Sequence, residues 1–229
     1  QEMKFSGTLS STTCSGTLFE FDIENVPNEI SVTEFNFNEG NLPTGWISSP
    51  NIVGQPCDVG SGNTPDNSDY FWATTTSGFG DSFGAGKRYV ATSPEDVSYG
   101  GSIEFLIRYG ADDPWNGGCE DPDWWSEEVY LKYSIDGGNN YVTFFDGWDI
   151  HNNKQKPWYS WYANDIDIPE AAQTSSTIFL WYQPYNNGPD WDNWGLDNIV
   201  VNANPAPTAS WTLDFGIDDI ETSVASGTT

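Results

Sequence analysis

Histidine is almost absent from this chain, which contains only His151. A catalytic triad or a Cys–His nucleophile needs a positioned histidine, and no convincing set of partners accompanies this one. No CxxC pair is present either, which disfavours a zinc site. Glu127 and Glu128 are adjacent carboxylates, but neighbouring residues on a strand point to opposite faces and cannot flank one glycosidic bond. We therefore expect that the chain is not an enzyme.

Basic residues are also scarce: 7 Lys and Arg stand against 34 Asp and Glu, which gives a formal net charge of −27. A surface of that sign repels nucleic acid and anionic membranes, so we expect neither as a partner. Two interpretations of the acidic residues remain open: they form a solvated coat, as in salt-adapted proteins, or they bind divalent cations. Because oxygen ligands suit Ca²⁺, we expect at least one structural calcium site.

Long apolar runs and glycosylation signals are missing too. No segment approaches the roughly 18 apolar residues that a membrane-spanning helix needs, so we expect no membrane insertion. No Asn-x-Ser/Thr sequon occurs. The chain begins at Gln1 and not at Met, which is typical of a processed secreted protein. We therefore expect an extracellular or cell-surface location.

Aromatic and turn-forming residues, by contrast, are abundant. Aromatic residues make up 16% of the sequence, and Gly and Pro are spread throughout it. The spacing of the turns, without helical periods, predicts an all-β fold: a two-sheet antiparallel jelly-roll sandwich. One strand is indicated by the regular alternation of Ile103, Phe105, Ile107 and Tyr109. We expect strands near 33–38, 70–74, 87–92, 102–109, 128–135, 141–145, 159–168, 177–183 and 196–202.

The clearest strand-and-turn signal lies between residues 127 and 141. An apolar residue occurs at every second position, which predicts one face in a core: Val129, Leu131, Tyr133 and Ile135. The run ends in a Gly- and Asn-rich turn, because these residues tolerate positive φ. The segment also contains the Asp-box pattern, formed by Ser134, Asp136, Gly138 and Tyr141. We expect Asp136 to tie down backbone amides of the turn, Gly138 to permit the bend, and Tyr141 to plug its base.

Together with a second segment, this hairpin resembles the sub-repeat of reelin-type proteins. The second segment has Trp181-Tyr182-Gln183-Pro184, then a short polar loop, then Trp194-Gly195-Leu196-Asp197-Asn198-Ile199. Upstream, residues 35–40 with Pro43 and Trp46 resemble the opening strand of such a jelly roll. The resemblance covers roughly residues 33–203 and implies an extracellular β-module.

The same resemblance implies a disulfide between Cys57 and Cys119, which both lie in Gly-rich surroundings. Cys14 is then left over, and we expect it to pair with a neighbouring chain or with a cysteine outside this sequence. The division we expect is a Ser/Thr-rich N-terminal extension with one strand (1–32), the jelly-roll domain (33–203), and a Pro linker with a C-terminal strand and tail (204–229).

Two sets of residues are candidate calcium ligands. In jelly rolls of this kind the first and last strands run side by side, so Asn36, Asn38 and Glu39 can meet Asp197 at one edge. The alternative is that Asp197 caps a turn and the asparagines are solvated. The second set lies in an acidic, Pro-bounded loop and comprises Asp112, Asp113, Glu120 and Asp121.

Clustered tryptophans are candidates for a binding surface: Trp124, Trp125, Trp158, Trp161, Trp191 and Trp194. Aromatic rings beside Asp and Asn hold sugars by stacking on C–H groups, and Trp also anchors protein interfaces. A third interpretation is that most of these rings plug loops onto the sandwich.

These observations favour a non-enzymatic secreted structural or adhesion module. We expect it to assemble with other copies of itself or with adjacent repeats in an extracellular fibre, appendage or cell-surface array, stabilised by calcium and a disulfide. The alternative is a carbohydrate-binding module that holds glycans on its Trp and Tyr clusters.

Overall fold

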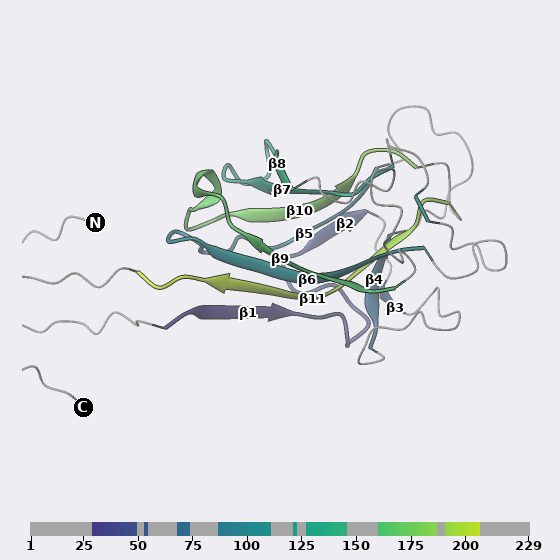
Figure 1. Cartoon of the computed structure of the whole chain (residues 1–229), viewed down its shortest axis with the longest axis horizontal. Coiled ribbons are helices and arrows are strands. Elements are labelled where there is room, and N and C mark those ends of the chain that lie inside the picture. Colours follow the sequence, from purple (N-terminus) through teal and green to yellow (C-terminus); the bar gives the residue numbers. More distant parts are fainter. Residues whose placement is uncertain are drawn as a thin grey trace, which may run out of the picture.

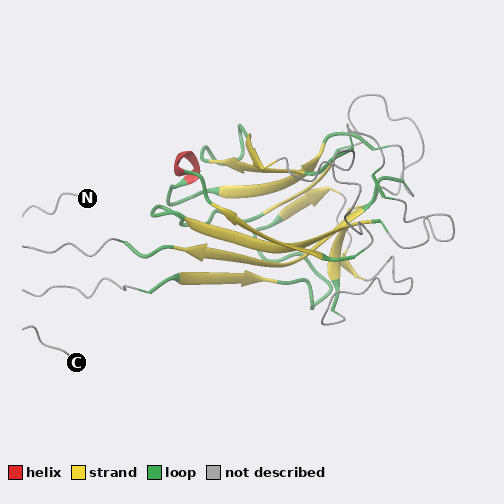
Figure 2. Cartoon of the chain, in the orientation of Figure 1, coloured by secondary structure: helices red, strands yellow, loops and turns green. Residues whose placement is uncertain are grey.

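Two antiparallel β-sheets face each other across a hydrophobic core (Figure 1). The structure, a computed structural model, describes residues 29–49, 53–54, 68–73, 87–110, 121–122, 127–145, 160–186 and 191–206. The six-stranded sheet contains β1 (Ser31–Phe35), β3 (Val53–Gly54), β4 (Tyr70–Ala73), β6 (Gly101–Tyr109), β9 (Tyr162–Asp167) and β11 (Trp194–Ala203). The five-stranded sheet contains β2 (Ile47–Ser49), β5 (Arg88–Ala91), β7 (Tyr130–Ser134), β8 (Val142–Phe145) and β10 (Ile178–Gln183). The only helical element in the described part is a single 3-10 turn, η1 (Glu170–Ala172), drawn red in Figure 2.

Strand β11 is the centre of the six-stranded sheet. It pairs with β6 along one side, and on the other side its first half pairs with β4 and its second half with β1. The register with β6 shifts between Asp197 and Val200, and Asn198 there has a φ of 49°, which Asn tolerates better than most residues. Because Ser31 is paired with Ala203, the chain enters and leaves the domain side by side (Figure 1).

The core is filled by the alternate side chains that the strand periods predict. All four apolar residues of the alternating run in β6 are 2% exposed or less: Ile103, Phe105, Ile107 and Tyr109. Across the core, the Trp181 ring of β10 meets Phe105 with centroids 5.2 Å apart and Trp46 at 6.3 Å. Large aromatic rings from both sheets thus interlock, and burying them supplies much of the driving force for folding.

The predicted two-sheet antiparallel sandwich is confirmed, and each of the nine expected strands overlaps an observed one. Strands β2 and β3 were missed, because three and two residues are too few to show a period. The expected core position of Ile135 is wrong: it is 50% exposed, whereas Ser134 is 1% exposed. The Asp-box turn begins at Ser134, so the strand alternation ends one residue earlier than the sequence suggests.

The predicted strands of both extensions lie outside the described residues, as do Cys14, Cys57 and Cys119. Among the described residues, no helix has the length and apolar character required to cross a membrane.

Candidate functional site

A row of three tyrosines crosses the solvent side of the five-stranded sheet. Tyr182 of β10 is paired with Tyr89 of β5 on one side and with Tyr130 of β7 on the other. Their strand neighbours Val90 and Trp181 are fully buried in the core, so the tyrosines point the opposite way. All three tyrosine side chains are partly exposed. We call this surface, with Lys132, the tyrosine face.

Lys132 joins the row from the next outward position of β7. Its ammonium lies 5.1 Å from the centroid of the Tyr182 ring and 5.8 Å from that of Tyr130. A cation within about 6 Å of an aromatic ring is attracted to the ring face. Burial lowers the pKa of the Lys132 ammonium. The tyrosine face therefore combines aromatic rings, hydroxyl groups and one partly desolvated positive charge.

A second row beside the tyrosines is apolar. Ala91 of β5 is paired with Ile47 on one side and with Leu180 on the other, and Leu180 is in turn opposite Lys132. The Ile47 side chain is 56% exposed. Ala91 and Leu180 are 0% and 7% exposed, so Ile47 is the member of this row that offers apolar surface to a ligand.

The strands of the tyrosine face are tied together beneath it by a buried guanidinium. Arg88, which is 0% exposed, donates from Nη1 to the backbone carbonyls of Asp192 at 2.6 Å and Trp191 at 2.9 Å. Nη1 also donates to Gln183 Oε1 at 3.4 Å, and Nη2 to Asn186 Oδ1 at 3.1 Å. One side chain of β5 thereby holds the end of β10 and the segment that leads into β11.

Gln183 extends this network to β7 and to the core. Its Nε2 donates to the carbonyls of Glu127 at 2.8 Å and Asp192 at 2.9 Å, and its Oε1 accepts from Trp194 Nε1 at 3.2 Å. Arg88 and Gln183 precede Tyr89 and follow Tyr182, respectively, in the sequence. The buried network therefore fixes β5, β10 and the residues before β7, the segments that carry the tyrosine row.

The charge of Arg88 is maintained inside this network. Desolvation by burial lowers its pKa to about 10, while the negative charges of Asp192 and Glu127 raise it. The guanidinium thus remains protonated at neutral pH. Asp192 itself has a φ of 57°, a left-handed conformation that costs energy and that the hydrogen bonds to its carbonyl help to hold.

The turn after β7 has the hydrogen bonds of an Asp-box. Asp136 Oδ1 accepts from the backbone N–H groups of Asn139 and Asn140, both at 3.0 Å, and from Ser134 Oγ at 2.8 Å. Asn140 Nδ2 donates to Asp136 Oδ2 at 2.7 Å, and the Gly138 N–H donates to Ser134 Oγ at 2.9 Å. These bonds lower the pKa of Asp136 to about 2, and the bond from the Asn140 side chain is the largest cause.

Gly138 and Tyr141 complete this turn. Gly138 has a φ of 88°, where a side chain is strained, and a Cβ there would lie 3.1 Å from Tyr141 Oη. Tyr141 is partly exposed and packs over the glycine. The arrangement stabilises the hairpin between β7 and β8, at the far end of β7 from Tyr130.

The first predicted calcium set is only partly brought together. Phe35 is paired with Ile199, so the opening and closing strands do run side by side. Asp197 is 0% exposed and accepts a hydrogen bond from Ser68 Oγ at 3.2 Å. Asn36, Asn38 and Glu39 are exposed, and Asn36 Oδ1 accepts from the backbone N–H of Asn38 at 3.3 Å. The described residues contain no group of three or more His, Cys, Asp or Glu side chains suited to a metal ion, and calcium binding by this mixed set stays a prediction.

Most of the second calcium set cannot be placed. Asp112, Asp113 and Glu120 lie outside the described residues, while Asp121 is described and partly buried. Asp121 packs closely on Gly110, where a Cβ would come within 2.7 Å of it.

The predicted tryptophan surface needs correction. Trp194 is 0% exposed and lies in the core, with its ring centroid 5.6 Å from that of Phe71, so its placement among exposed aromatics is wrong. It begins β11 with its side chain turned inward. Trp161 is partly buried, and its ring centroid lies 5.0 Å from that of Tyr70. This position agrees with the interpretation that some of these rings pack onto the sandwich. Trp191 is partly exposed, and Trp124, Trp125 and Trp158 lie outside the described residues.

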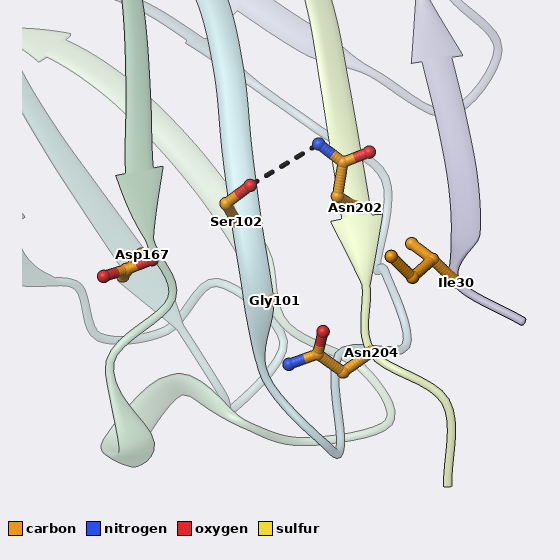
Figure 3. A pocket seen from close by; sticks show the side chains of 6 residues that line it. All are labelled: Ile30, Gly101, Ser102, Asp167, Asn202 and Asn204. Carbon is orange, nitrogen blue, oxygen red and sulfur yellow. Dashed lines mark hydrogen bonds between the residues drawn. The ribbon is translucent and has the colours of Figure 1, made fainter. Parts of the chain in front are cut away.

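A shallow hollow lies on the six-stranded sheet at the end where the chain enters and leaves the domain (Figure 3). Its lining is mostly polar: Ile30, Gly101, Ser102, Asp167, Asn202 and Asn204. Asn202 Nδ2 points toward Ser102 Oγ at 3.4 Å and donates to Glu104 Oε1 at 2.6 Å, so its amide serves the sheet itself. The hollow is open and no aromatic residue lines it, which makes it a weaker candidate than the tyrosine face.

Comparison with known families agrees with the Asp-box hairpin and the closing strand. The family model of reelin subrepeat B matches residues 73–202, which is more than half of the chain. The chain belongs to the reelin subrepeat B family. The match includes all three tyrosines of the tyrosine face and the whole buried network beneath it. Reelin repeats are extracellular modules, and the predicted resemblance to them is confirmed.

Solved structures of similar shape are adhesin and carbohydrate-binding modules. One is the K1 cleaved adhesin domain of Lys-gingipain from Porphyromonas gingivalis W83, with 15% identity and a TM-score of 0.44 over 76% of this chain and 99% of that chain. Another is TmCBM61 in complex with β-1,4-galactotriose, with 14% identity and a TM-score of 0.39 over 73% and 94%. A third is the mannan-recognising module TmCBM27, with 12% identity and a TM-score of 0.36 over 76% and 97%. Identities this low carry no ligand over to this reelin-type chain.

The tyrosine face was not predicted from the sequence. Its members are single tyrosines on separate strands, and only the pairing of β5 with β10 and of β10 with β7 brings them together. A signal was nevertheless present. Tyr130 and Lys132 occupy the outward positions of the alternating run, and Tyr182 lies between the inward Trp181 and Gln183.

Proposed function

We propose that this chain is a non-enzymatic extracellular adhesion module that holds a partner on its tyrosine face. The observation that carries this proposal is the row formed by Tyr89, Tyr182 and Tyr130 on the solvent side of a sheet whose strands are tied together from within. Tyrosine offers a large rigid contact area and a hydroxyl at little conformational cost, which suits recognition. A fixed row of this kind requires little reorganisation when a partner binds.

The chemistry of the described residues supports binding more than catalysis. Glu127 is 1% exposed, and Glu128, its neighbour, is only partly buried, so the two carboxylates do not open onto one site. Membership of the reelin subrepeat B family supports an extracellular location. We include in the proposal a calcium ion near Asp197 and a disulfide between Cys57 and Cys119, both of which suit that compartment.

The position of the chain ends fits a displayed module. The chain enters at Ser31 and leaves at Ala203, which are paired neighbours at one end of the sandwich (Figure 1). Tyr89 and Tyr182 lie beside the buried network at the other end, where β10 finishes. A module attached through its ends thereby keeps the tyrosine face clear of its own linkers.

The proposal is tested by retention of the purified chain on two kinds of surface, immobilised polysaccharides and an immobilised second copy of the chain. The double variant Tyr89→Ala/Tyr182→Ala is compared with the control double variant Tyr99→Ala/Tyr162→Ala. Tyr99 and Tyr162 lie outside the tyrosine face and are 45% and 42% exposed. We expect the first double variant to lose retention on at least one surface and the control to keep it. Equal retention of both double variants, or no retention of the unchanged chain on either surface, contradicts the proposal.

A second candidate function, assembly with other copies, is favoured by the exposed strand β1. Within the described strands β1 pairs only with β11, and Ile30 and Val32 beside that open edge are 58% and 53% exposed. Open edges accept a further strand by backbone hydrogen bonding. Sedimentation at increasing concentration should show larger species that Val32→Asp removes and Thr143→Asp, on β8, does not. A strictly monomeric chain contradicts assembly.

A further inference from the structure

The exposed positive charge of the described residues is concentrated at the tyrosine face. The described part of the chain contains four basic residues, of which Arg88 and Arg108 are 0% and 1% exposed. The two that reach solvent are Lys87 and Lys132. Lys132 lies among the tyrosines, and Lys87 precedes Tyr89 by two positions, which places it on the same side of an extended chain.

This distribution differs from what the composition alone would give. With 34 acidic and 7 basic residues, an average patch of this surface is negative. An exposed lysine on such a surface attracts a negative group of a ligand at short range. The acidic residues further than about 10 Å away oppose this attraction little, because their charges are screened at moderate salt. The Lys132 ammonium lies over two rings and is partly removed from solvent. It has therefore lost part of the hydration that stabilises an exposed ammonium. A bound anion beside it would replace that stabilisation with a charge-assisted hydrogen bond.

The shape of the tyrosine face suits an extended ligand. Neighbouring strands lie about 4.8 Å apart, so the row of partly exposed rings from Tyr89 to Tyr130 spans about 10 Å. Such a strip offers apolar contact for the C–H faces of sugar rings and hydroxyls for hydrogen bonds with sugar hydroxyls. Two lysines suffice for a ligand with widely spaced charges, but not for nucleic acid, with one charge per about 1.7 Å of duplex.

We propose that the tyrosine face binds an acidic polysaccharide, with pyranose rings along the row of Tyr89, Tyr182 and Tyr130 and a carboxylate or sulfate of the sugar on Lys132. The inference rests on the proposed function, because it names the partner of the same surface. Lys132 gives the charge selectivity, and the tyrosines give the affinity for the sugar chain itself.

The test uses ligands that differ only in charge. Binding of the full chain is measured by calorimetry on polygalacturonate and its methyl ester, and on a sulfated galactan and its desulfated form. We expect at least one acidic form to bind about ten-fold tighter than its neutral partner, as one charge-assisted hydrogen bond implies. Raising the NaCl concentration from about 0.1 M to about 1 M shortens the screening length from about 10 Å to about 3 Å and should remove most of that preference.

Three variants separate the contributions of charge and ring. Lys132→Gln should abolish the preference for the acidic form over the neutral form, whereas Lys132→Arg should retain that preference. Tyr182→Ala should weaken both forms, and Tyr99→Ala serves as the control at an exposed tyrosine elsewhere. Thermal melts establish that each variant is folded.

The outcomes distinguish this inference from the function on which it rests. Equal affinity for acidic and neutral forms, or no binding to either pair, overturns the acidic-glycan proposal. If the chain then binds its own copies or a neutral glycan through the same tyrosines, the adhesion function stands without it. If Tyr182→Ala changes binding to no surface, both proposals fail.

Discussion

The guanidinium of Arg88 lies 2.6 Å from the backbone carbonyl of Asp192, a residue 104 positions away in the sequence. This contact joins the first residue of β5 to the segment before β11, and thus ties together the two sheets of the sandwich. Other donors and acceptors of the same network reach β10 and the residues before β7. The tyrosine face is therefore backed by this polar network as well as by core residues such as Val90 and Trp181.

Replacing Arg88 should destabilise the whole domain. Arg88→Met leaves several buried oxygens without their charged donor, and we expect a loss of about 3–5 kcal/mol in the free energy of unfolding. Urea unfolding followed by tryptophan fluorescence measures it. Arg88→Lys, which keeps the charge but lacks the fork of donors, should recover only part of the loss. A loss below about 1 kcal/mol, the size of an ordinary surface effect, would show that the network is not structural.

The Asp-box carboxylate should make stability depend on acid pH. Because hydrogen bonds hold the pKa of Asp136 at about 2, below its usual 3.8, its contribution is present above the unfolded value and is lost as the pH falls through the folded one. Asp136→Ala should therefore melt at a lower temperature than the unchanged chain at pH 7. The difference should shrink between about pH 4 and about pH 2. Glu34→Ala, which removes one exposed carboxylate from β1, is the control. A difference between the melting temperatures that is constant across this range argues against the turn as its source.

A side chain at Gly195 should destabilise the domain. A Cβ there would lie 3.0 Å from Cη2 of Trp161 and 3.1 Å from Cε3 of Trp72, both in large rings. We expect Gly195→Ala to cost about 1–3 kcal/mol of stability through overpacking. Gly137→Ala serves for comparison, since a Cβ there meets nothing within 4 Å and its cost reflects only the positive φ of 74°. If neither Trp161→Ala nor Trp72→Ala relieves the penalty of Gly195→Ala in a double variant, the proposed clash is not its cause.

Removing calcium should lower the melting temperature. A site saturated at about 100 times its Kd contributes about 2.7 kcal/mol, which corresponds to about 5–10 °C for a domain of this size. Melts with EDTA, with excess Ca²⁺, and with NaCl of matched ionic strength separate specific binding from screening of the 34 acidic residues. Asp197→Asn should abolish the calcium effect if the first predicted set is the site. Equal rescue by NaCl identifies the acids as a solvated coat.

The strands were predictable because their periods are local. In β6 every second residue is apolar and buried, and the expected and observed bounds differ by a single residue. The positions of individual aromatics were less predictable. Trp194 follows a polar stretch and looks like a loop residue, yet the first position of β11 turns it into the core. The local sequence does not show whether the side chain at the first position of a strand faces the core or the solvent.

The candidate site was not predictable for a further reason. Tyr89, Tyr130 and Tyr182 form one surface only through the register of three strands that are far apart in the sequence. Arg88 belongs to a residue type that is mostly exposed in proteins, yet it is fully buried here. Two of the four acceptors described above are backbone carbonyls, which no pattern of side chains can reveal.

The pairing of Ser31 with Ala203 has a mechanical consequence. Tension applied through the two ends of the domain pulls these neighbours apart at right angles to their strands. The bonds of β1 with β11 then carry the load one after another, from Ser31 toward Phe35, and not all at once. Strand β1 should therefore peel away at low force while the tyrosine face, on the other sheet, stays intact. The domain would lengthen under tension while its five-stranded sheet stays folded.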